Sequence, residues 1–141
     1  WSAGSPEEYL NDESKIPTTY TDPSGLNPYN SQLSTISIKW DESSTDEVKQ
    51  ERIITQKWIA NWMLGNEAWA DYRRTGYPKL IPTTDEGNMS GGTVDNKKGA
   101  RRMPYPSAEY IDNTVNVQYA VNNYLKRADN MATDLWWACK P

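Results

Sequence analysis

Histidine and phenylalanine are absent from this 141-residue sequence, and cysteine occurs once. Without histidine, Ser-His-Asp and Cys-His catalytic arrangements and all imidazole metal sites are excluded. Cys139 has no second cysteine with which to form an internal disulfide or a thiolate cluster. We therefore expect no cofactor and no metal ion, and we interpret Cys139 as chemically inert.

Long apolar runs and positive charge are also scarce. Apolar residues make up 36% of the chain, and the longest uninterrupted apolar run is a few residues, whereas a transmembrane helix needs about 20. The formal net charge of −4 at pH 7 argues against a nucleic-acid partner, because nucleic acids attract basic surfaces. The 7 tryptophans and 9 tyrosines supply all the aromatic volume, and this content argues against intrinsic disorder.

The beginning of the chain is atypical for a mature protein. Its first residues, WSAGSPEEYL, contain neither an initiator methionine nor a basic segment followed by an apolar one. We expect the chain to be the C-terminal part of a longer protein, whose remaining N-terminal part is then one of its partners. Under this interpretation, the lack of a signal segment carries no information about the compartment.

The first 43 residues are polar and rich in turn-forming residues. Ser5 followed by Pro6 predicts a short helix that is capped by Ser5 and runs to about Leu10. Prolines and a glycine between residues 16 and 31 indicate an ordered loop. Apolar and polar residues alternate over residues 33–40, which predicts a short strand.

Residues 44–76 carry the strongest helical signal. Ser44 and Glu47 have the spacing of a capping box, with Ser44 as the N-cap of a helix that runs to about Met63. Gly65-Asn66 predicts a break, and a second helix is expected over residues 67–74, ended by the sequence TGYP.

The remaining chain predicts a loop and two helices. Residues 77–106 are expected to form a long loop, whose prolines extend its last six residues. Within residues 107–141, Ser107 is expected to cap a helical turn to Asp112, and a further helix is expected over residues 115–127. No linker separates these parts, so residues 1–141 are predicted to lie in one domain of mainly α class.

Aromatic residues fall into two groups. On a continuous helix Trp58, Trp62, Trp69 and Tyr72 lie on one face, which indicates a buried stripe or, alternatively, an exposed platform for sugar stacking. Our candidate ligand contacts are Trp40, at the end of the predicted strand, and the loop residues Tyr29 and Tyr20, because ligand-binding residues are often found in loops on a rigid scaffold. Packing of the loops is the alternative interpretation for these three.

Charged residues give only weak signals for catalysis or metal binding. Glu67 with Asp71, and Glu47 with Glu51, have helical spacing, but two residues of one helical turn seldom form the two sides of a catalytic cleft. We expect solvated faces or pairing with Lys57, Arg73 and Arg74, and no catalytic residues. Oxygen ligands for calcium occur at Asp85, Glu86 and Asp95, but their spacing matches no EF-hand loop. The two Arg-Arg pairs are interpreted as partners of internal carboxylates.

Two blocks of residues together resemble a known family. The first is ITQKWIA at residues 54–60, followed by GNEAWADYRRTGYP at residues 65–78. The second is RRMPYP at residues 101–106, followed by Glu109, Asn113 and Asp129, and by LWW at residues 135–137. In order and spacing these blocks, which cover about residues 45–137, are similar to the C-terminal signature of SusD/RagB-type outer-membrane lipoproteins. The signature residues are Trp58, Glu67, Trp69, Tyr72, Arg73, Arg74, Arg101, Arg102, Tyr105, Glu109, Asn113, Trp136 and Trp137.

The resemblance implies a mainly α-helical fold, in which tetratricopeptide-like helix pairs form a scaffold and long irregular loops carry the ligand site. It also implies a protein that is lipid-anchored to the outer face of the Gram-negative outer membrane. Such proteins bind glycan oligomers, or in some cases peptides, and act as a lid over a SusC-like TonB-dependent β-barrel transporter without cleaving the ligand. The lipidated cysteine is expected in the N-terminal part, and Cys139 does not match it. The signature residues are expected to hold the fold and not to touch ligand.

Three other functions compatible with the sequence stay open at this point. A stand-alone carbohydrate-binding module predicts a complete β-rich domain with an exposed aromatic row. A glycoside hydrolase fragment predicts turnover of oligosaccharides. A structural helical-repeat segment predicts no ligand of its own.

Overall fold

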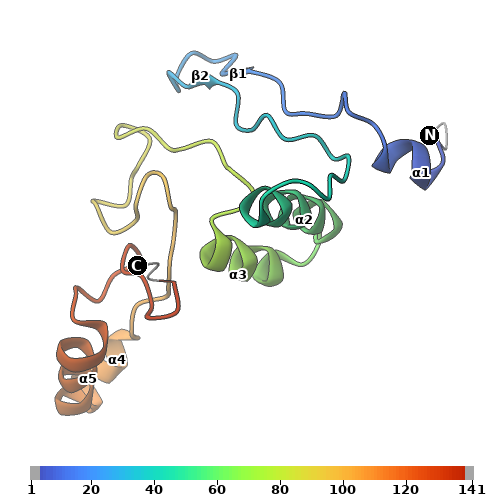
Figure 1. Ribbon diagram of the computed structural model, residues 1–141. Coiled ribbons are helices and arrows are strands. Elements are labelled where there is room, and N and C mark those ends of the chain that lie inside the picture. The colour runs from blue at the N-terminus through green and yellow to red at the C-terminus, as the bar shows by residue number, and fades with distance from the viewer. Residues whose placement is uncertain (1–3, 139–141) are drawn as a thin grey trace. The chain divides into compact units, whose positions relative to one another are not determined.

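The computed structural model describes residues 4–138, and helix predominates over strand in this range, as predicted. Figure 1 shows the elements in chain order. They are α1 (Pro6–Leu10), β1 (Tyr20–Thr21), β2 (Asn30–Ser31), α2 (Asp46–Ala60), α3 (Gly65–Thr75), α4 (Ser107–Asp112), α5 (Thr114–Ala120) and the π-helical turn η1 (Val121–Leu125). Cys139 lies outside the described residues.

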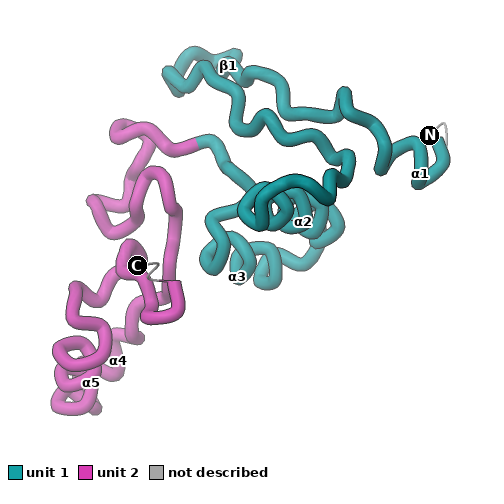
Figure 2. The backbone as a smooth tube through the Cα atoms, in the orientation of Figure 1, with its two compact units in different colours: residues 1–81 teal, residues 82–141 magenta. Residues whose placement is uncertain are grey.

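The chain forms two compact units, residues 1–81 and residues 82–141 (Figure 2). The first contains α1, the β1–β2 pair, α2 and α3, and the second contains α4, α5 and η1. The assignment of residues 1–141 to one domain stays a prediction.

In the first unit a narrow antiparallel ribbon precedes α2. Tyr20 pairs with Ser31 and Thr21 with Asn30, and the two segments continue beside each other toward α1 and α2 (Figure 1). Beyond the paired residues, side chains join the segments: the Gln32 amide donates to the Pro17 carbonyl at 2.7 Å. Side-chain bonds therefore extend a ribbon whose backbone ladder is only two residues long.

The predicted strand at residues 33–40 is wrong. No backbone–backbone hydrogen bond joins these residues to another segment of the described chain. Polar side chains hold the segment instead: the Ser34 hydroxyl accepts from Ile36 N, and Arg52 Nε donates to the Ser37 carbonyl at 3.0 Å. Alternation nevertheless separates the two sides of the segment, since Ile36 and Ile38 line a different cavity from Thr35 and Lys39.

The cap of α2 is shifted by one residue from its predicted position. Thr45 is the N-cap, and its hydroxyl accepts from Val48 N, whereas the Ser44 hydroxyl donates to the Asp41 carboxylate at 2.8 Å. Ser44 is thus engaged by Asp41, which leaves Thr45 to cap the helix. The capping box at Ser44 is wrong; in α1, by contrast, Ser5 is the cap as predicted and forms a capping box.

Helix α3 begins at Gly65, two residues before the predicted start, and ends as predicted at Gly76. Gly76 adopts φ of 79°, and its N–H donates to the Tyr72 carbonyl at 2.8 Å. This left-handed conformation favours glycine, because a β-carbon crowds the following carbonyl there.

Gly76→Ala is expected to lower the free energy of unfolding by about 1–2 kcal/mol, because no atom lies within 4 Å of the added β-carbon and only backbone strain remains. Gly65→Ala is the matched control, since its β-carbon also meets open space and its φ is outside the left-handed region. We expect this control to be neutral or slightly stabilising in urea denaturation. Equal effects of the two substitutions contradict the backbone explanation.

The predicted tryptophan stripe is interrupted between α2 and α3. Trp58 and Tyr72 make an edge-to-face contact with ring centroids 6.4 Å apart, and the Arg73 guanidinium covers the Trp69 ring at 3.7 Å. Trp62, however, is 85% exposed. Residues 61–64 form the turn between the two helices, so Trp62 does not continue the helical face.

The interior of both units is largely polar. Among the described residues, the buried apolar side chains are Ile54, Ala68 and Val117. The buried polar and charged residues are Glu51, Arg52, Asp71, Thr75, Arg101, Arg102 and Thr133. Hydrogen bonds and ion pairs therefore contribute much of the specific packing.

In the second unit the extended segment 101–106 leads into α4, as predicted. Two details differ from the predictions. Ser107 is the first residue of α4 and not its cap, and the last predicted helix divides into α5 and η1 and ends at Leu125. Lys126, with φ of 54°, ends η1, because a left-handed residue cannot continue a right-handed helix.

Candidate ligand-binding site

Trp40 lies just before α2 with 47% of its surface exposed. Its indole Nε1–H donates to Glu42 Oε2 at 2.7 Å, and Lys49 Nζ bonds Glu42 Oε1 at 3.1 Å. Lys49 Nζ and Arg52 Cζ, both on α2, lie 5.8 and 6.0 Å from the ring centroid. These contacts orient the ring and hold the pKa of Glu42 below its usual range, through the Trp40 bond first and Lys49 second.

A hollow of about 500 Å³ lies beside this ring. We call it the Trp40 hollow; its walls are Glu13, Ile16, Thr35, Ser37, Lys39, Trp40, Asp41 and Arg52. Lys39 pairs with Glu13 across the ribbon. An aromatic face among polar side chains is the composition expected of a site for a hydroxyl-rich ligand.

Arg52 is the most buried charge of the Trp40 hollow, with 8% of its surface exposed. Its Nε–H bonds the Ser37 carbonyl, whereas Nη1 is buried without a hydrogen-bond partner in the described part of the chain. Asp41 is exposed at the same hollow and accepts from the Ser43 backbone and hydroxyl and from the Ser44 hydroxyl. These bonds, the Ser43 hydroxyl foremost, lower the pKa of Asp41 to about 2.

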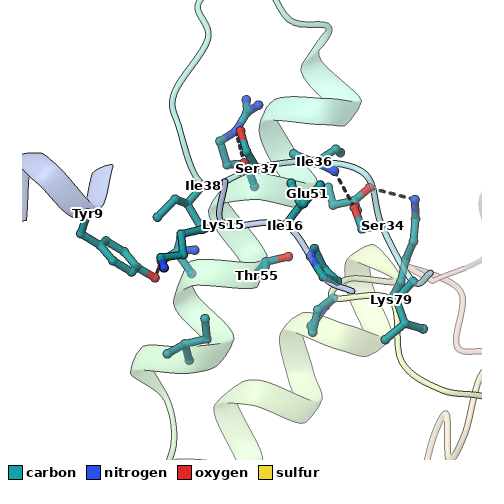
Figure 3. A pocket seen from close by; sticks show the side chains of 16 residues that line it. Tyr9, Lys15, Ile16, Ser34, Ile36, Ser37, Ile38, Glu51, Thr55 and Lys79 are labelled. Carbon is teal, nitrogen blue, oxygen red and sulfur yellow. Dashed lines mark hydrogen bonds and ion pairs between the residues drawn. The ribbon is translucent and has the colours of Figure 1, made fainter. Parts of the chain in front are cut away.

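A second cavity, of about 370 Å³, is lined by residues of the segment 33–38 (Figure 3) and shares Ile16, Ser37 and Arg52 with the Trp40 hollow. Its walls are mainly apolar and include Ile16, Ile36 and Ile38. The buried Glu51 carboxylate is held in the wall by the Ser34 hydroxyl and by Lys79 Nζ at 3.1 Å (Figure 3). The alternating sequence thus gives one short segment an apolar side and a polar side.

The three predicted ligand contacts are not brought together. Trp40 lines the Trp40 hollow, whereas Tyr20 lies in β1 and Tyr29 immediately precedes β2, so neither lines this hollow. Arg52 and Asp41 were missed by sequence reasoning. The DESS sequence at residues 41–44 was a usable signal for Asp41, because Asp-x-Ser favours a side-chain turn.

The first block of signature residues surrounds Asp71, which is buried in α3. Its two carboxylate oxygens contact Lys57 Nζ at 2.7 Å and Arg74 Nη2 at 3.0 Å. Glu67 lies on the exposed first turn of α3. The expected pairing of Asp71 with neighbouring cations is therefore observed.

The second block ties the extended segment 101–106 to residues 129–134. Arg101 Nε bonds Asp134 at 2.6 Å, and Arg102 Nη1 bonds Asp129. Asp129 also accepts from the Tyr105 backbone N–H and from the Tyr110 hydroxyl, which lies 2.6 Å away. One carboxylate thus joins the Tyr-Pro segment, α4 and the loop after η1.

The remaining signature residues of the second unit lie near α4 and at the C-terminal turn. The Asn113 amide donates to Glu109 Oε2 at 2.9 Å, which joins the last turn of α4 to its first. Trp136 and Trp137 are both exposed.

Acid is expected to destabilise the protein through three aspartates with lowered pKa values. The hydrogen bond from Lys57 lowers the pKa of Asp71. Burial alone raises the pKa of Asp129 and of Asp134, but the hydrogen bonds and positive charges around each carboxylate lower it by more. The stabilisation that these aspartates give the folded protein is complete above about pH 3.9, the pKa of an aspartate in the unfolded chain. It is lost as the pH falls through their lower pKa values in the folded protein. Urea denaturation is expected to give constant stability from about pH 7 to 5 and a decline below about pH 4. Constant stability down to about pH 3 contradicts this account.

The residues considered for calcium bond one another in the second unit. The Asn96 amide donates to the Asp85 carboxylate, and Asp95 accepts from the backbone N–H groups of Lys97 and Lys98. Within residues 4–138 no three acidic or cysteine side chains are grouped as metal ligands. No helix in that range is long and apolar enough to span a bilayer.

Solved structures of known proteins resemble this chain over nearly its whole length. A SusD homolog from Bacteroides uniformis is 68% identical with a TM-score of 0.89, and the match covers 99% of this chain and 29% of that one. A SusD homolog from Bacteroides ovatus is 42% identical, with a TM-score of 0.81 and coverages of 99% and 29%. A chitin-binding SusD homolog from Flavobacterium johnsoniae is 39% identical, with a TM-score of 0.81 and coverages of 98% and 28%.

The chain thus spans less than a third of the length of these relatives, 28–29%. No curated protein matches it. The likeness confirms the expected fold class, since these relatives have tetratricopeptide-like helical folds. The family model for the Susd and RagB outer membrane lipoproteins matches residues 1–138. The chain belongs to the SusD-like family of outer membrane lipoproteins.

Proposed function

We propose that the protein binds neutral glycan oligomers in the Trp40 hollow, at the outer face of the outer membrane, and does not cleave them. The observation that carries this proposal is the Trp40 ring, half exposed and fixed by Glu42 at the wall of a polar hollow. A rigid aromatic face excludes water from one side of a sugar ring, and polar neighbours bind its hydroxyls. SusD-like proteins generally bind glycans, and a relative 39% identical to this chain is chitin-binding.

The carboxylates of the Trp40 hollow are unsuited to glycoside hydrolysis. A hydrolase needs one carboxylic acid that is protonated at working pH, which requires a raised pKa. Asp41 has its pKa lowered to about 2, and Glu13 is paired with Lys39. A non-catalytic role is therefore the function that these groups support.

Isothermal titration of the intact protein tests ligand class. The probes are hexasaccharides of neutral sugars, namely maltohexaose, cellohexaose, xylohexaose and chitohexaose, and a library of hexapeptides. Binding of at least one glycan without product formation is the expected result. Binding of peptides alone, as for the peptide-binding members implied by the resemblance, contradicts the proposal, and release of shorter sugars contradicts its non-catalytic part.

We further propose that the protein delivers its ligand to a SusC-like TonB-dependent β-barrel transporter and is held at the membrane by an N-terminal lipid. Membership of a family of outer membrane lipoproteins supports this part. Tagged protein, extracted from its own host in mild detergent, is expected to retain a large β-barrel at nearly equal stoichiometry. Recovery of the protein alone in several detergents contradicts the transporter assignment.

For the signature residues we propose a structural role without ligand contact. Arg73, stacked on Trp69 at 3.7 Å, is the simplest case. Arg73→Ala is expected to lower the free energy of unfolding by about 1–2 kcal/mol through the lost stacking, and to leave glycan affinity unchanged. Calorimetric titration and thermal unfolding of the same sample check both parts. Intact stability with abolished binding contradicts the proposal.

A further inference from the structure

The guanidinium of Arg52 has more hydrogen-bonding capacity than the surrounding protein uses. Of its five N–H donors, only Nε–H has a hydrogen-bond partner in the described part of the chain, and the buried Nη1 has none. A buried donor without a partner is costly, and few such groups occur in a folded protein. Arg52 lines both the Trp40 hollow and the adjacent cavity, whose walls are mainly apolar. The hollow is the more polar of the two, so a polar ligand in the hollow is the candidate for the absent acceptor.

Asp41 supplies the complementary acceptor at the same hollow. Three hydrogen bonds from Ser43 and Ser44 fix its carboxylate, whereas an ionised carboxylate accepts about four. Arg52 lies close enough to contribute to the lowered pKa of Asp41, but its side-chain hydrogen bond goes to the Ser37 carbonyl and not to Asp41. An unused donor and an acceptor with spare capacity therefore lie on the walls of one cavity, beside the Trp40 ring.

Adjacent hydroxyls of a pyranose match this arrangement. Each hydroxyl both donates and accepts, so one of the pair accepts from a guanidinium while its neighbour donates to a carboxylate. We propose that Arg52 and Asp41 bind two adjacent hydroxyls of an uncharged sugar whose ring lies against Trp40. This inference rests on the proposed function, and it adds the recognising residues and the chemical class of the sugar.

The charges of the Trp40 hollow favour an uncharged ligand over a uronate. Glu13 and Asp41 balance Lys39 and Arg52 in its walls, so the formal charge of the cavity is zero. Lys39 is already paired with Glu13, and Lys49 beside the ring is paired with Glu42. A carboxylated sugar places a second negative charge near Asp41, which opposes binding.

Calorimetric titration of the intact protein with the neutral hexasaccharides named above, and with hexagalacturonate as the charged counterpart, tests the inference. The variants are Arg52→Lys, which keeps the charge but loses the planar fork, and Asp41→Asn, which keeps an acceptor but loses the charge. Each is expected to weaken binding of the best neutral hexasaccharide by about tenfold or more, the loss typical of a hydrogen bond to a charged group.

Asp12→Asn is the matched control for Asp41→Asn. Asp12 accepts from the Ser14 backbone and hydroxyl as Asp41 does from Ser43, but it does not line the Trp40 hollow. We expect Asp12→Asn to bind the best neutral hexasaccharide with wild-type affinity. If circular dichroism shows that Arg52→Lys does not fold, the comparison of glycan affinity between Asp41→Asn and Asp12→Asn tests the inference by itself.

A deoxy analogue of the bound sugar separates ligand contact from structural damage. Removing the hydroxyl that donates to Asp41 is expected to weaken binding to the wild-type protein by about tenfold. The same deoxy sugar is expected to bind Asp41→Asn nearly as well as the parent sugar does, because this variant has already lost the contact between the hydroxyl and the Asp41 carboxylate. Wild-type affinity in Asp41→Asn and Arg52→Lys, or tighter binding of hexagalacturonate than of any neutral glycan, overturns this inference and leaves glycan binding standing. Failure of every neutral glycan to bind overturns the proposed function as well.

Discussion

Asp129→Asn is expected to lower the free energy of unfolding by about 3–5 kcal/mol, the cost typical of breaking one side of a buried ion pair. Arg102 is 6% exposed, and its guanidinium pairs with the Asp129 carboxylate. The neutral amide leaves this guanidinium without a countercharge in a largely water-free environment. The substitution also weakens the bonds from the Tyr110 hydroxyl and the Tyr105 N–H.

Urea denaturation followed by circular dichroism measures this effect, with Asp112→Asn as the matched control. Asp112 is an exposed aspartate at the end of α4, and its substitution is expected to change stability by less than about 0.5 kcal/mol. Combining Asp129→Leu with Arg102→Met is expected to recover part of the loss, because no unpaired charge then remains buried. If Asp129→Asn lowers the free energy of unfolding by less than about 1 kcal/mol, Asp129 does not hold these segments together as argued above.

Trp40→Ala is expected to weaken glycan binding by about 30-fold or more, the loss that defines an aromatic hot spot of about 2 kcal/mol. The substitution removes the face on which the sugar ring lies and the Nε1–H that fixes Glu42. Since nearly half of the Trp40 surface is exposed, little core packing is lost, and the melting temperature is expected to change only slightly. Calorimetric titration with the best neutral hexasaccharide is the measurement.

Trp62→Ala is the matched control for Trp40→Ala. Trp62 is the same residue type, is 85% exposed in the turn between α2 and α3, and does not line the Trp40 hollow. Wild-type affinity is expected for this variant. Equal losses of affinity in the two variants contradict the assignment of the site to the Trp40 hollow.

Sequence signals predicted the ends of helices correctly where a single residue determines the local backbone conformation. Ser5 with Pro6 begins α1, and Gly76 ends α3, because capping groups and positive φ act within a few residues. Ser44 was misread as a cap because Ser44 and Thr45 offer the same hydroxyl chemistry. The deciding contact is the Asp41 carboxylate three residues away, which binds Ser44.

Features that depend on contacts between distant parts of the chain were harder to predict from the sequence. The alternation of residues 33–40 is real, but a strand also needs a partner ladder, and Arg52, 15 residues from Ser37, takes the Ser37 carbonyl instead. Similarly, the helical face that includes Trp62 exists only if α2 and α3 are continuous, and the turn at residues 61–64 ends it.

The candidate site was predictable only in part. Residue type and position in the sequence were enough to propose Trp40 as a ligand contact, and the structure shows that its ring is half exposed. Arg52 lies within α2, where an arginine ordinarily indicates a solvated helix face, and its burial depends on the segment folded over it. Tyr20 and Tyr29 are also aromatic, but they lie on the β1–β2 ribbon and do not line the Trp40 hollow, so their ligand role stays a prediction.

Fluorine NMR of the protein labelled with 5-fluorotryptophan tests the central claim most directly, because each indole reports separately on its surroundings. The resonance missing from Trp40→Phe identifies Trp40, and that missing from Trp62→Phe identifies the exposed reference. On titration with the best neutral hexasaccharide, we expect the Trp40 resonance to shift saturably, with the dissociation constant found by calorimetry, while the Trp62 resonance stays in place. Saturable glycan binding that leaves the Trp40 resonance unmoved contradicts the account.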